Sequence, residues 1–329
     1  MTDQRPVCTA SFPLNNGASM PAVGLGTWQA KGRPGTSDEE SLVDSLVYAL
    51  QNGYRLLDTA QVYGVERVVG KAVRKCGIPR EEITIVTKFW SHWHHNPEEA
   101  LNKSLEALQL DYVDVFLMHW PFATTPDRKV LRPNESPTIA ETWKMMESLV
   151  GPKCKAIGVS NFTQKTLEMI LASATIVPAV NQIELHAFYP CLKLVPYCQS
   201  KGIHVMGWGT LGGGDSGPMS EILKHKTFVE LAESKGCSPG VLSLSWAVQR
   251  GVTVIPKTKS KSRMDENIRL VSLNDEEMGK MNSAHKYIRR HRVADDNPHM
   301  DVWIDGLKTM QGWTTVELGW EDENGNWLT

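Results

Sequence analysis

Two hydrophobic patterns alternate along most of the chain. Short runs rich in β-branched residues recur, and each is followed by a stretch in which apolar residues return at helical spacing. The runs predict eight strands, near residues 22–28, 55–60, 83–89, 113–120, 155–161, 179–186, 204–211 and 252–258. Strands that alternate with helices form parallel βαβ units, and eight such units close into a barrel. The predicted fold class is therefore α/β, a single (β/α)8 TIM barrel.

Helix boundaries agree with this reading. Ser37 is followed by acidic residues and then by an apolar face that ends at Asn52-Gly53, as in a capped helix. Asn96-Pro97 and Ser238-Pro239 have the residue types that begin helices, a side-chain cap followed by proline in the first turn. Each of these segments therefore predicts a helix that follows one of the predicted strands.

Two regions lie outside the alternation. Residues 12–23 hold Asn16-Gly17 between short apolar pieces, which predicts an N-terminal β-hairpin ahead of the barrel. From about Asn282 onward the chain is polar and irregular, which predicts a tail without clear elements, either functional or disordered. We expect residues 1–329 to form one domain, with the barrel core at about 12–285 and a C-terminal substrate loop and tail at about 286–329.

Composition narrows the classes of partner. The 329 residues carry a net charge of −2, which offers no general attraction to nucleic acid or to an anionic membrane. No apolar run approaches the roughly 20 residues of a membrane helix, and the N-terminus lacks a signal-peptide pattern. We therefore expect a cytoplasmic protein that binds a small molecule and is a monomer or a weak homodimer.

Candidate catalytic residues lie where the predicted strands end. Asp58 ends the second predicted strand, with Tyr63 five residues later, Lys88 ends the third, and His119 ends the fourth. A lone residue of these types near a strand end is usually structural, but four on three neighbouring strands are unusual. In (β/α)8 barrels the reacting groups lie at the carboxyl ends of the strands.

These four side chains suit the reduction of a carbonyl group. A hydride added to a carbonyl creates an alkoxide, which a tyrosine such as Tyr63 can protonate. An ammonium beside a tyrosine lowers the tyrosine pKa, so Lys88 would activate Tyr63, and Asp58 would hold Lys88 ionised. His119 would hydrogen-bond the carbonyl oxygen and polarise it.

Tryptophans border the same strand ends. Trp28, Trp90 and Trp120 are expected to form an apolar wall that excludes water from the substrate, although core packing is the alternative. The segment 297–303, with Trp303, is expected to complete the substrate pocket. Its mixture of polar and aromatic groups favours small polar aldehydes, trioses and aldopentoses over steroids.

Six motifs extend these observations: GYRLLDTAQVYG, IVTKFW, DVFLMHWP, AIGVSNF, AVNQIELH and VIPKT, in this order along residues 12–267. In them the chain resembles the aldo-keto reductase family, and in particular its fungal aldose, glyceraldehyde and xylose reductase-like members. The resemblance implies NADPH-dependent reduction of aldehydes and ketones to alcohols, with the catalytic tetrad on Asp58, Tyr63, Lys88 and His119. It implies no metal, although His92, His94 and His95 form a dense cluster.

The resemblance also implies a cofactor site. Ser160, Asn161 and Gln182 match the family's contacts to the nicotinamide carboxamide, and Trp208 stands where the family usually stacks a tyrosine or phenylalanine on that ring. The implied 2′-phosphate site falls on Lys257, Thr258 and Arg263, and a lysine and an arginine are the expected partners of a dianion. The implied residues toward the adenine are Glu266 and Asn267, and the remaining implied cofactor residues are Thr27, Leu211 and Asp215.

Two departures concern the segment that covers the cofactor in relatives. The position after Trp28, often lysine, is Gln29, and a glycine-rich stretch, Gly212-Gly213-Gly214, precedes Asp215. Two other functions stay open: an NADP-dependent polyol dehydrogenase acting on a substrate such as glycerol, and a regulatory or structural subunit of this fold. The reacting groups serve either direction, so the residues alone do not choose between reduction and oxidation.

Overall fold

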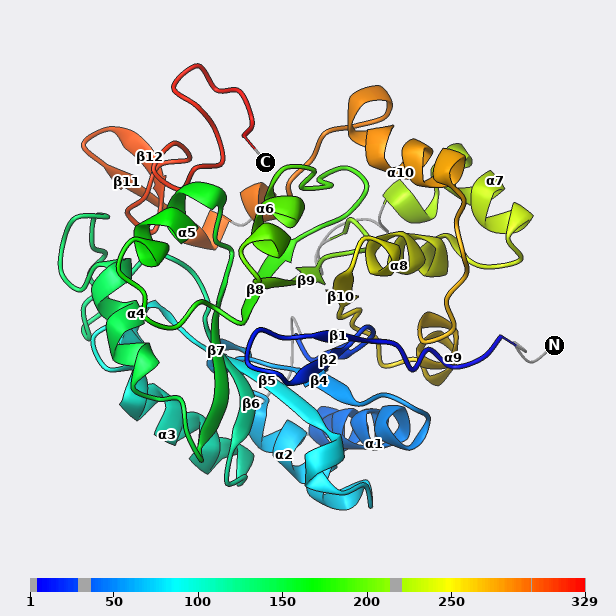
Figure 1. The fold of residues 1–329 in the computed structure, drawn as a ribbon, viewed down its shortest axis with the longest axis horizontal. Helices are drawn as coiled ribbons and strands as arrows, with labels where there is room; N and C mark the ends of the chain where they lie inside the picture. The colour runs from blue at the N-terminus through cyan, green and yellow to red at the C-terminus, as the bar shows by residue number, and fades with distance from the viewer. Residues whose placement is uncertain (1–4, 29–36, 214–220, 297, 329) are drawn as a thin grey trace.

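The computed structural model describes residues 5–28, 37–213, 221–296 and 298–328. Eight parallel strands form one sheet in the order β10-β9-β8-β7-β6-β5-β4-β3 (Figure 1). Its two edges meet where Val23 bridges Val254 and the Gly24 amide donates to the Val254 carbonyl at 2.8 Å. The predicted (β/α)8 barrel is confirmed. Its strands are β3 Leu25–Gly26, β4 Leu56–Asp58, β5 Thr84–Phe89, β6 Val113–Met118, β7 Cys154–Ser160, β8 Val180–Glu184, β9 His204–Trp208 and β10 Val252–Val254.

Helices surround the sheet (Figure 1). The predicted caps at Asn96 and Ser238 are present, since each side chain accepts the backbone N–H of the residue three positions on. The helix predicted after residue 36 begins at Ser37. The helices are α1 Ser37–Gln51, α2 Glu66–Lys75, α3 Pro97–Leu108, α4 Ile139–Glu147, α5 Gln164–Leu171, α6 Leu194–Ser200, α7 Lys226–Ser234, α8 Pro239–Gln249, α9 Lys261–Asn267 and α10 Asp275–Tyr287.

The N-terminal hairpin is the predicted one, and it plugs the barrel. Strand β1 Ser11–Pro13 pairs with β2 Ser19–Pro21, and Gly17 takes the positive φ of 86° that the turn needs. Leu14 and Met20 from this hairpin belong to the same buried cluster as the inward-facing residues of the barrel strands. Burying these side chains closes one end of the barrel, so a ligand must enter at the carboxyl ends of the strands.

The C-terminal region corrects the prediction of a tail without elements. Helix α10 continues to Tyr287, five residues past Asn282. Beyond it, β11 Asp301–Ile304 pairs with β12 Leu307–Met310 through a turn at Asp305-Gly306. The prediction missed this hairpin although Asp-Gly between alternating residues is a strong hairpin signal.

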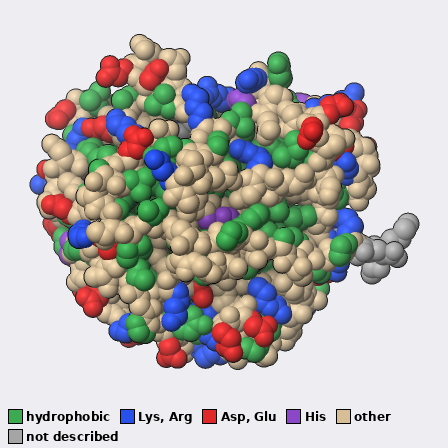
Figure 2. Space-filling view, viewed as in Figure 1, with side chains coloured by type: hydrophobic (Ala, Val, Ile, Leu, Met, Phe, Trp, Pro, Cys, Tyr) green, Lys and Arg blue, Asp and Glu red, His purple; other side chains and the backbone are tan. Residues whose placement is uncertain are grey.

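The surface agrees with a small net charge. On the face shown in Figure 2, lysine and arginine are interspersed with aspartate and glutamate, so that face carries no single-sign field. In the described part of the chain, no helix has the length and apolar character needed to cross a bilayer.

Candidate active site

Three of the four predicted catalytic residues come from consecutive strand ends. Asp58 is the last residue of β4, Lys88 is the penultimate residue of β5, and His119 directly follows β6. Tyr63 ends a short 3₁₀ turn, Gln61–Tyr63, just after β4. Because β4, β5 and β6 are hydrogen-bonded neighbours, these four side chains lie at one edge of the barrel mouth.

Lys88 is the centre of this group. Its side chain is 0% exposed, and its Nζ lies 2.8 Å from Asp58 Oδ1 and 2.8 Å from the carbonyl of Thr59. The same Nζ lies 3.5 Å from Tyr63 Oη and 5.0 Å from the centre of the Tyr63 ring. The structure thus brings together the tyrosine, the lysine and the aspartate that were predicted at the strand ends.

Burial disfavours the ionised forms of Lys88 and Asp58, and their pairing favours those forms. Burial lowers the pKa of Lys88, while the carboxylates of Asp58 and Glu66 act in the opposite direction. Burial likewise raises the pKa of Asp58, against the charge of Lys88 and the hydrogen bonds from Lys88 and Gln182. Each charge therefore depends on its partner, because a lone charge in such a place costs several kcal/mol or more.

The His119 imidazole is buried, and its surroundings favour the neutral form. Burial, together with the charge of Lys88, keeps its pKa well below the usual range. Its ring centre is 5.7 Å from that of Tyr63 and 5.1 Å from that of Trp90, in edge-on contacts. Nδ1 is buried with no hydrogen-bond partner among the described residues, so in its predicted role His119 would contact a substrate oxygen through Nε2.

The three tryptophans predicted to form the apolar wall lie at the barrel mouth. Trp28, 44% exposed, has its ring 4.9 Å from that of Tyr63, and Trp90 contacts His119. Trp120 is buried and stacks on Phe122 at 5.2 Å. Trp303 stands 70% exposed on β11 opposite Lys308. Within the described residues, no aromatic contact joins Trp303 to the other three, so its substrate role stays a prediction.

The residues predicted to hold the nicotinamide form a hydrogen-bonded set at the ends of β7 and β9 and in the middle of β8. The Ser160 hydroxyl donates to the Gln182 carbonyl at 2.9 Å, and Gln182 Nε2 donates to Asp58 Oδ2 at 2.7 Å. Trp208 Nε1 donates to Asn161 Oδ1 at 2.9 Å. The predicted cofactor contacts are therefore hydrogen-bonded to one another and to the catalytic pair.

The other predicted cofactor residues lie farther round the mouth. The Thr27 hydroxyl donates to the Asp58 carbonyl at 2.9 Å, which ties β3 to β4. Leu211 follows β9 and is half-buried. Asp215 and Gln29 lie outside the described residues. The predicted phosphate and adenine residues follow β10 or lie on α9: Lys257 and Arg263 are exposed, Glu266 is half-buried, and Thr258 and Asn267 are buried.

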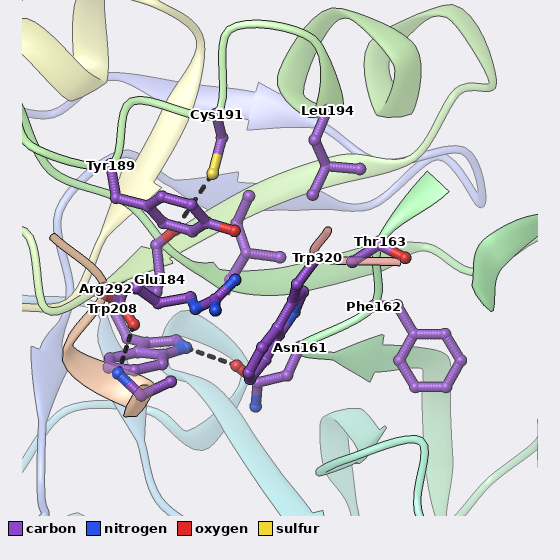
Figure 3. Close-up of a pocket in the computed structure, with 12 residues that line it drawn as sticks. Asn161, Phe162, Thr163, Glu184, Tyr189, Cys191, Leu194, Trp208, Arg292 and Trp320 are labelled. Carbon is purple, nitrogen blue, oxygen red and sulfur yellow. Dashed lines mark hydrogen bonds between the residues drawn. The ribbon is translucent and has the colours of Figure 1, made fainter. Parts of the chain in front are cut away.

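The C-terminal tail supplies pocket residues that the sequence reasoning missed. Trp320 and Arg292 line a cavity together with Asn161, Trp208 and Glu184 (Figure 3). The Trp320 ring is 6.2 Å from that of Trp120, edge-on. No local signal marks Trp320, because its neighbours come from distant strands; the cluster of tryptophans in the tail was the only hint.

One histidine of the cluster, His94, has a structural role. His94 is fully buried, where burial lowers its pKa to about 3, and Thr142 donates to the His94 carbonyl at 3.2 Å. Over residues 5–28, 37–213, 221–296 and 298–328, no three His, Cys, Asp or Glu side chains are arranged to hold a metal ion.

Comparisons with known proteins agree with this geometry. Residues 22–286 match the model of the Aldo/keto reductase family. The chain is 41% identical to the D-galacturonate reductase of Hypocrea jecorina, over 83% of this chain and 89% of that protein. It is 38% identical to the glycerol 2-dehydrogenase (NADP(+)) of Saccharomyces cerevisiae, over 88% of this chain and 95% of that protein.

Solved structures show the same likeness. An aldo-keto reductase in complex with NADPH superposes with a TM-score of 0.78 at 33% identity, covering 87% of this chain and 91% of that one. A Bombyx mori aldo-keto reductase in complex with NADP superposes with a TM-score of 0.77 at 32% identity, covering 88% and 97%.

Proposed function

The chain belongs to the aldo/keto reductase family, and from that premise we propose that it is an NADP-dependent oxidoreductase that reduces aldehydes and ketones to alcohols. The observation that carries this proposal is the buried Lys88, whose Nζ lies 2.8 Å from Asp58 and 3.5 Å from the hydroxyl of Tyr63. A tyrosine beside a buried ammonium at a barrel mouth is better suited to donate a proton than to a purely structural role.

The residues present fit a phosphorylated nicotinamide cofactor. Arg263 and Lys257 are exposed cations near one edge of the mouth, as a 2′-phosphate requires. Trp208 offers a ring face, and Ser160, Asn161 and Gln182 offer amide and hydroxyl groups for a carboxamide. When bound, NADPH supplies the hydride. The family resemblance supports each of these roles, and the two related structures that contain NADPH or NADP support the choice of cofactor.

The chain's own residues perform the proton chemistry. In the proposed reaction, the carbonyl oxygen accepts hydrogen bonds from Tyr63 Oη and from neutral His119 Nε2. As the carbonyl carbon gains the hydride, its C=O π bond breaks and the oxygen takes the proton of Tyr63. The phenolate that remains is stabilised by Lys88 and regains a proton from solvent. The lowered pKa of His119 favours its neutral form, and a neutral imidazole donates here when its proton is on Nε2.

For substrate, we propose small polar aldehydes or sugars such as glyceraldehyde, aldopentoses or a sugar acid. The similarity to a D-galacturonate reductase supports this class. The alternative, oxidation of a polyol such as glycerol, is supported by the similarity to a glycerol 2-dehydrogenase. A regulatory or structural subunit is the third candidate, and the intact tetrad argues against it.

Steady-state rates separate these candidates. The purified chain should oxidise NADPH in the presence of glyceraldehyde, xylose or galacturonate, and it should oxidise NADH much more slowly. A higher kcat/KM with NADP plus glycerol, at the same pH, would favour the dehydrogenase. No turnover in either direction would contradict the enzyme and favour a structural role.

The proposal includes the protein's form in solution. We infer one domain, 1–329, acting as a monomer or a weak homodimer in the cytoplasm, with no nucleic-acid or membrane partner. The small net charge and the mixed charges on the face shown in Figure 2 support the absence of a nucleic-acid or anionic-membrane partner. Sedimentation velocity at micromolar concentration would test the oligomeric state, and a stable tetramer would contradict it.

A further inference from the structure

Asn161 is a junction between three elements. It follows β7 in the left-handed conformation, with a φ of 64°, and its backbone N–H donates to the Gln182 carbonyl of β8 at 2.8 Å. Its Nδ2 donates to the His119 carbonyl at 2.9 Å and to Ser160 Oγ at 3.1 Å. Its Oδ1 accepts the indole N–H of Trp208, from the end of β9, at 2.9 Å (Figure 3).

The orientation of the Asn161 amide follows from its partners. An indole N–H can only donate, and a peptide carbonyl can only accept. Trp208 must therefore face the amide oxygen, and His119 must face the amide nitrogen, so a flipped amide would lose both bonds. Trp208 thereby selects the amide orientation that holds the His119 carbonyl.

His119 depends on such outside support. Its Nδ1 is buried without a hydrogen-bond partner among the described residues, so that nitrogen does not hold the ring. Edge-on contacts with Tyr63 and Trp90 confine the ring, and two backbone bonds hold the peptide: its N–H to the Phe89 carbonyl at 3.2 Å and its carbonyl to Asn161. A shift of this peptide would displace Nε2 relative to Tyr63.

We propose that Trp208 is a positioning residue for His119, acting through Asn161. The indole N–H fixes the Asn161 amide, and that amide fixes the backbone from which the His119 imidazole projects. This role is separate from the stacking role expected of the Trp208 ring, since phenylalanine would keep a ring face but would lose the N–H. The inference rests on the proposed reductase function.

The substitution Trp208→Phe tests this role. With NADPH saturating, kcat should fall about 3- to 10-fold, the effect of losing one hydrogen bond that orders a reacting group. KM for the carbonyl substrate and the Kd for NADPH should change less than about 3-fold, because the ring remains. The matched control is Trp246→Phe, on α8. It removes an indole N–H hydrogen bond to Asn282 Oδ1 of α10, which is also 2.9 Å long. That control should leave kcat unchanged.

A double-mutant cycle identifies the route. If Trp208 acts through Asn161, Trp208→Phe should have little further effect on kcat in an Asn161→Ala background. The NMR signal of the Trp208 indole N–H is the one that is lost in Trp208→Phe. In the protein without cofactor, this hydrogen should exchange slowly with solvent, and in Asn161→Ala it should exchange much faster. An undiminished Trp208→Phe effect in the Asn161→Ala background, or unchanged indole exchange, would overturn the proposal.

Failure of this inference and failure of the proposed function give different results. If the wild-type protein reduced no carbonyl substrate, the function itself would fall, and the role of Trp208 with it. If the wild-type protein were active and Trp208→Phe kept the wild-type kcat, only the role of Trp208 would fall.

Discussion

Lys88 imposes the arrangement of its neighbours. A buried ammonium is costly unless it is paired and hydrogen-bonded, and here Asp58 and the Thr59 carbonyl both lie 2.8 Å from its Nζ. Gln182 Nε2 donates a hydrogen bond to the second oxygen of Asp58, Oδ2, at 2.7 Å. The remaining direction from Nζ leads to Tyr63, so the charge of Lys88 is directed at the one hydroxyl expected to lose a proton.

Removal of the Tyr63 hydroxyl should therefore abolish proton donation with little effect on cofactor binding. We expect Tyr63→Phe to lower kcat by about 10²- to 10⁴-fold, the usual contribution of a positioned general acid. Quenching of protein fluorescence by NADPH should give a nearly unchanged Kd. Tyr112→Phe, at a ring that packs on Arg80, should retain the wild-type rate. Near-normal turnover by Tyr63→Phe would show that another group donates the proton.

Arg263 tests the assignment of the 2′-phosphate. Arg263→Ala should raise the Kd for NADPH about 10- to 100-fold, the loss expected for a charge-assisted hydrogen bond, and should leave the Kd for NADH almost unchanged. Arg289→Ala, another exposed arginine, paired with Glu221 at 3.2 Å, serves as the control. An equal rise in the Kd for NADPH and for NADH in Arg263→Ala would contradict a contact between Arg263 and the 2′-phosphate.

Strand positions could be predicted because hydrophobic runs report burial, but the ends of the strands depend on backbone chemistry. The run at 252–258 gives a strand only over Val252–Val254, and Pro256 just beyond has no N–H for the ladder. The run at 204–211 stops at Trp208, because Gly209 takes a φ of 64°. The positions of the four candidate catalytic residues were predictable for the same reason, since each lies at or just after a recognisable strand end.

The tail could not be predicted in the same way, because it is held by contacts between distant residues. Arg292, 2% exposed, lies over the rings of Trp320 at 4.0 Å and Trp327 at 4.7 Å, and it pairs with Asp295 at 2.8 Å. Glu184 at the end of β8 accepts the backbone N–H of Ala294 at 2.9 Å. No periodicity in residues 288–328 predicts these contacts, and the sequence pointed to Trp303 as the tail's pocket residue, whereas Arg292 and Trp320 line the cavity.

Arg292 should therefore stabilise the tail far more than its neighbour Arg290. We expect Arg292→Met to lower the free energy of unfolding by about 2–4 kcal/mol, because it removes a buried cation and leaves its acidic partners unpaired. Arg290 is exposed and lies over the Trp327 ring at 4.3 Å, so Arg290→Met should cost less than about 1 kcal/mol. Urea unfolding of both variants checks this, and equal losses would contradict the structure of the tail.

The barrel as a unit buries histidines that must stay neutral. Burial lowers the pKa of His94 to about 3 and that of His204 to about 4. His204 Nε2 lies 2.8 Å from the Thr253 hydroxyl, which itself donates to the Pro21 carbonyl, so the imidazole joins the barrel to its N-terminal plug. Since both folded-state pKa values lie below about 6.5, the value in an unfolded chain, the unfolded state binds protons first on acidification.

This linkage predicts a loss of stability on acidification. The contribution of each histidine is complete above about pH 6.5 and is lost at up to roughly 1.4 kcal/mol per pH unit as the pH falls toward the folded pKa. We expect His204→Gln to reduce the drop in unfolding free energy between about pH 7.5 and about pH 5 by about 2 kcal/mol. The comparison is between the drops, so any constant cost of the substitution cancels. Equal drops in wild type and variant would show that His204 already titrates in the folded state.

The transfer of a labelled hydrogen tests the proposed reaction itself. Enzyme preloaded with NADPH carrying deuterium at the pro-R position of nicotinamide C4 is mixed with glyceraldehyde or galacturonate, and the alcohol product is analysed by mass spectrometry. The account predicts one deuterium on the new carbinol carbon in wild type, and a product yield over the same interval that is lower by about 10²-fold or more in Tyr63→Phe. A product without deuterium, or equal yields from the two proteins, would contradict it.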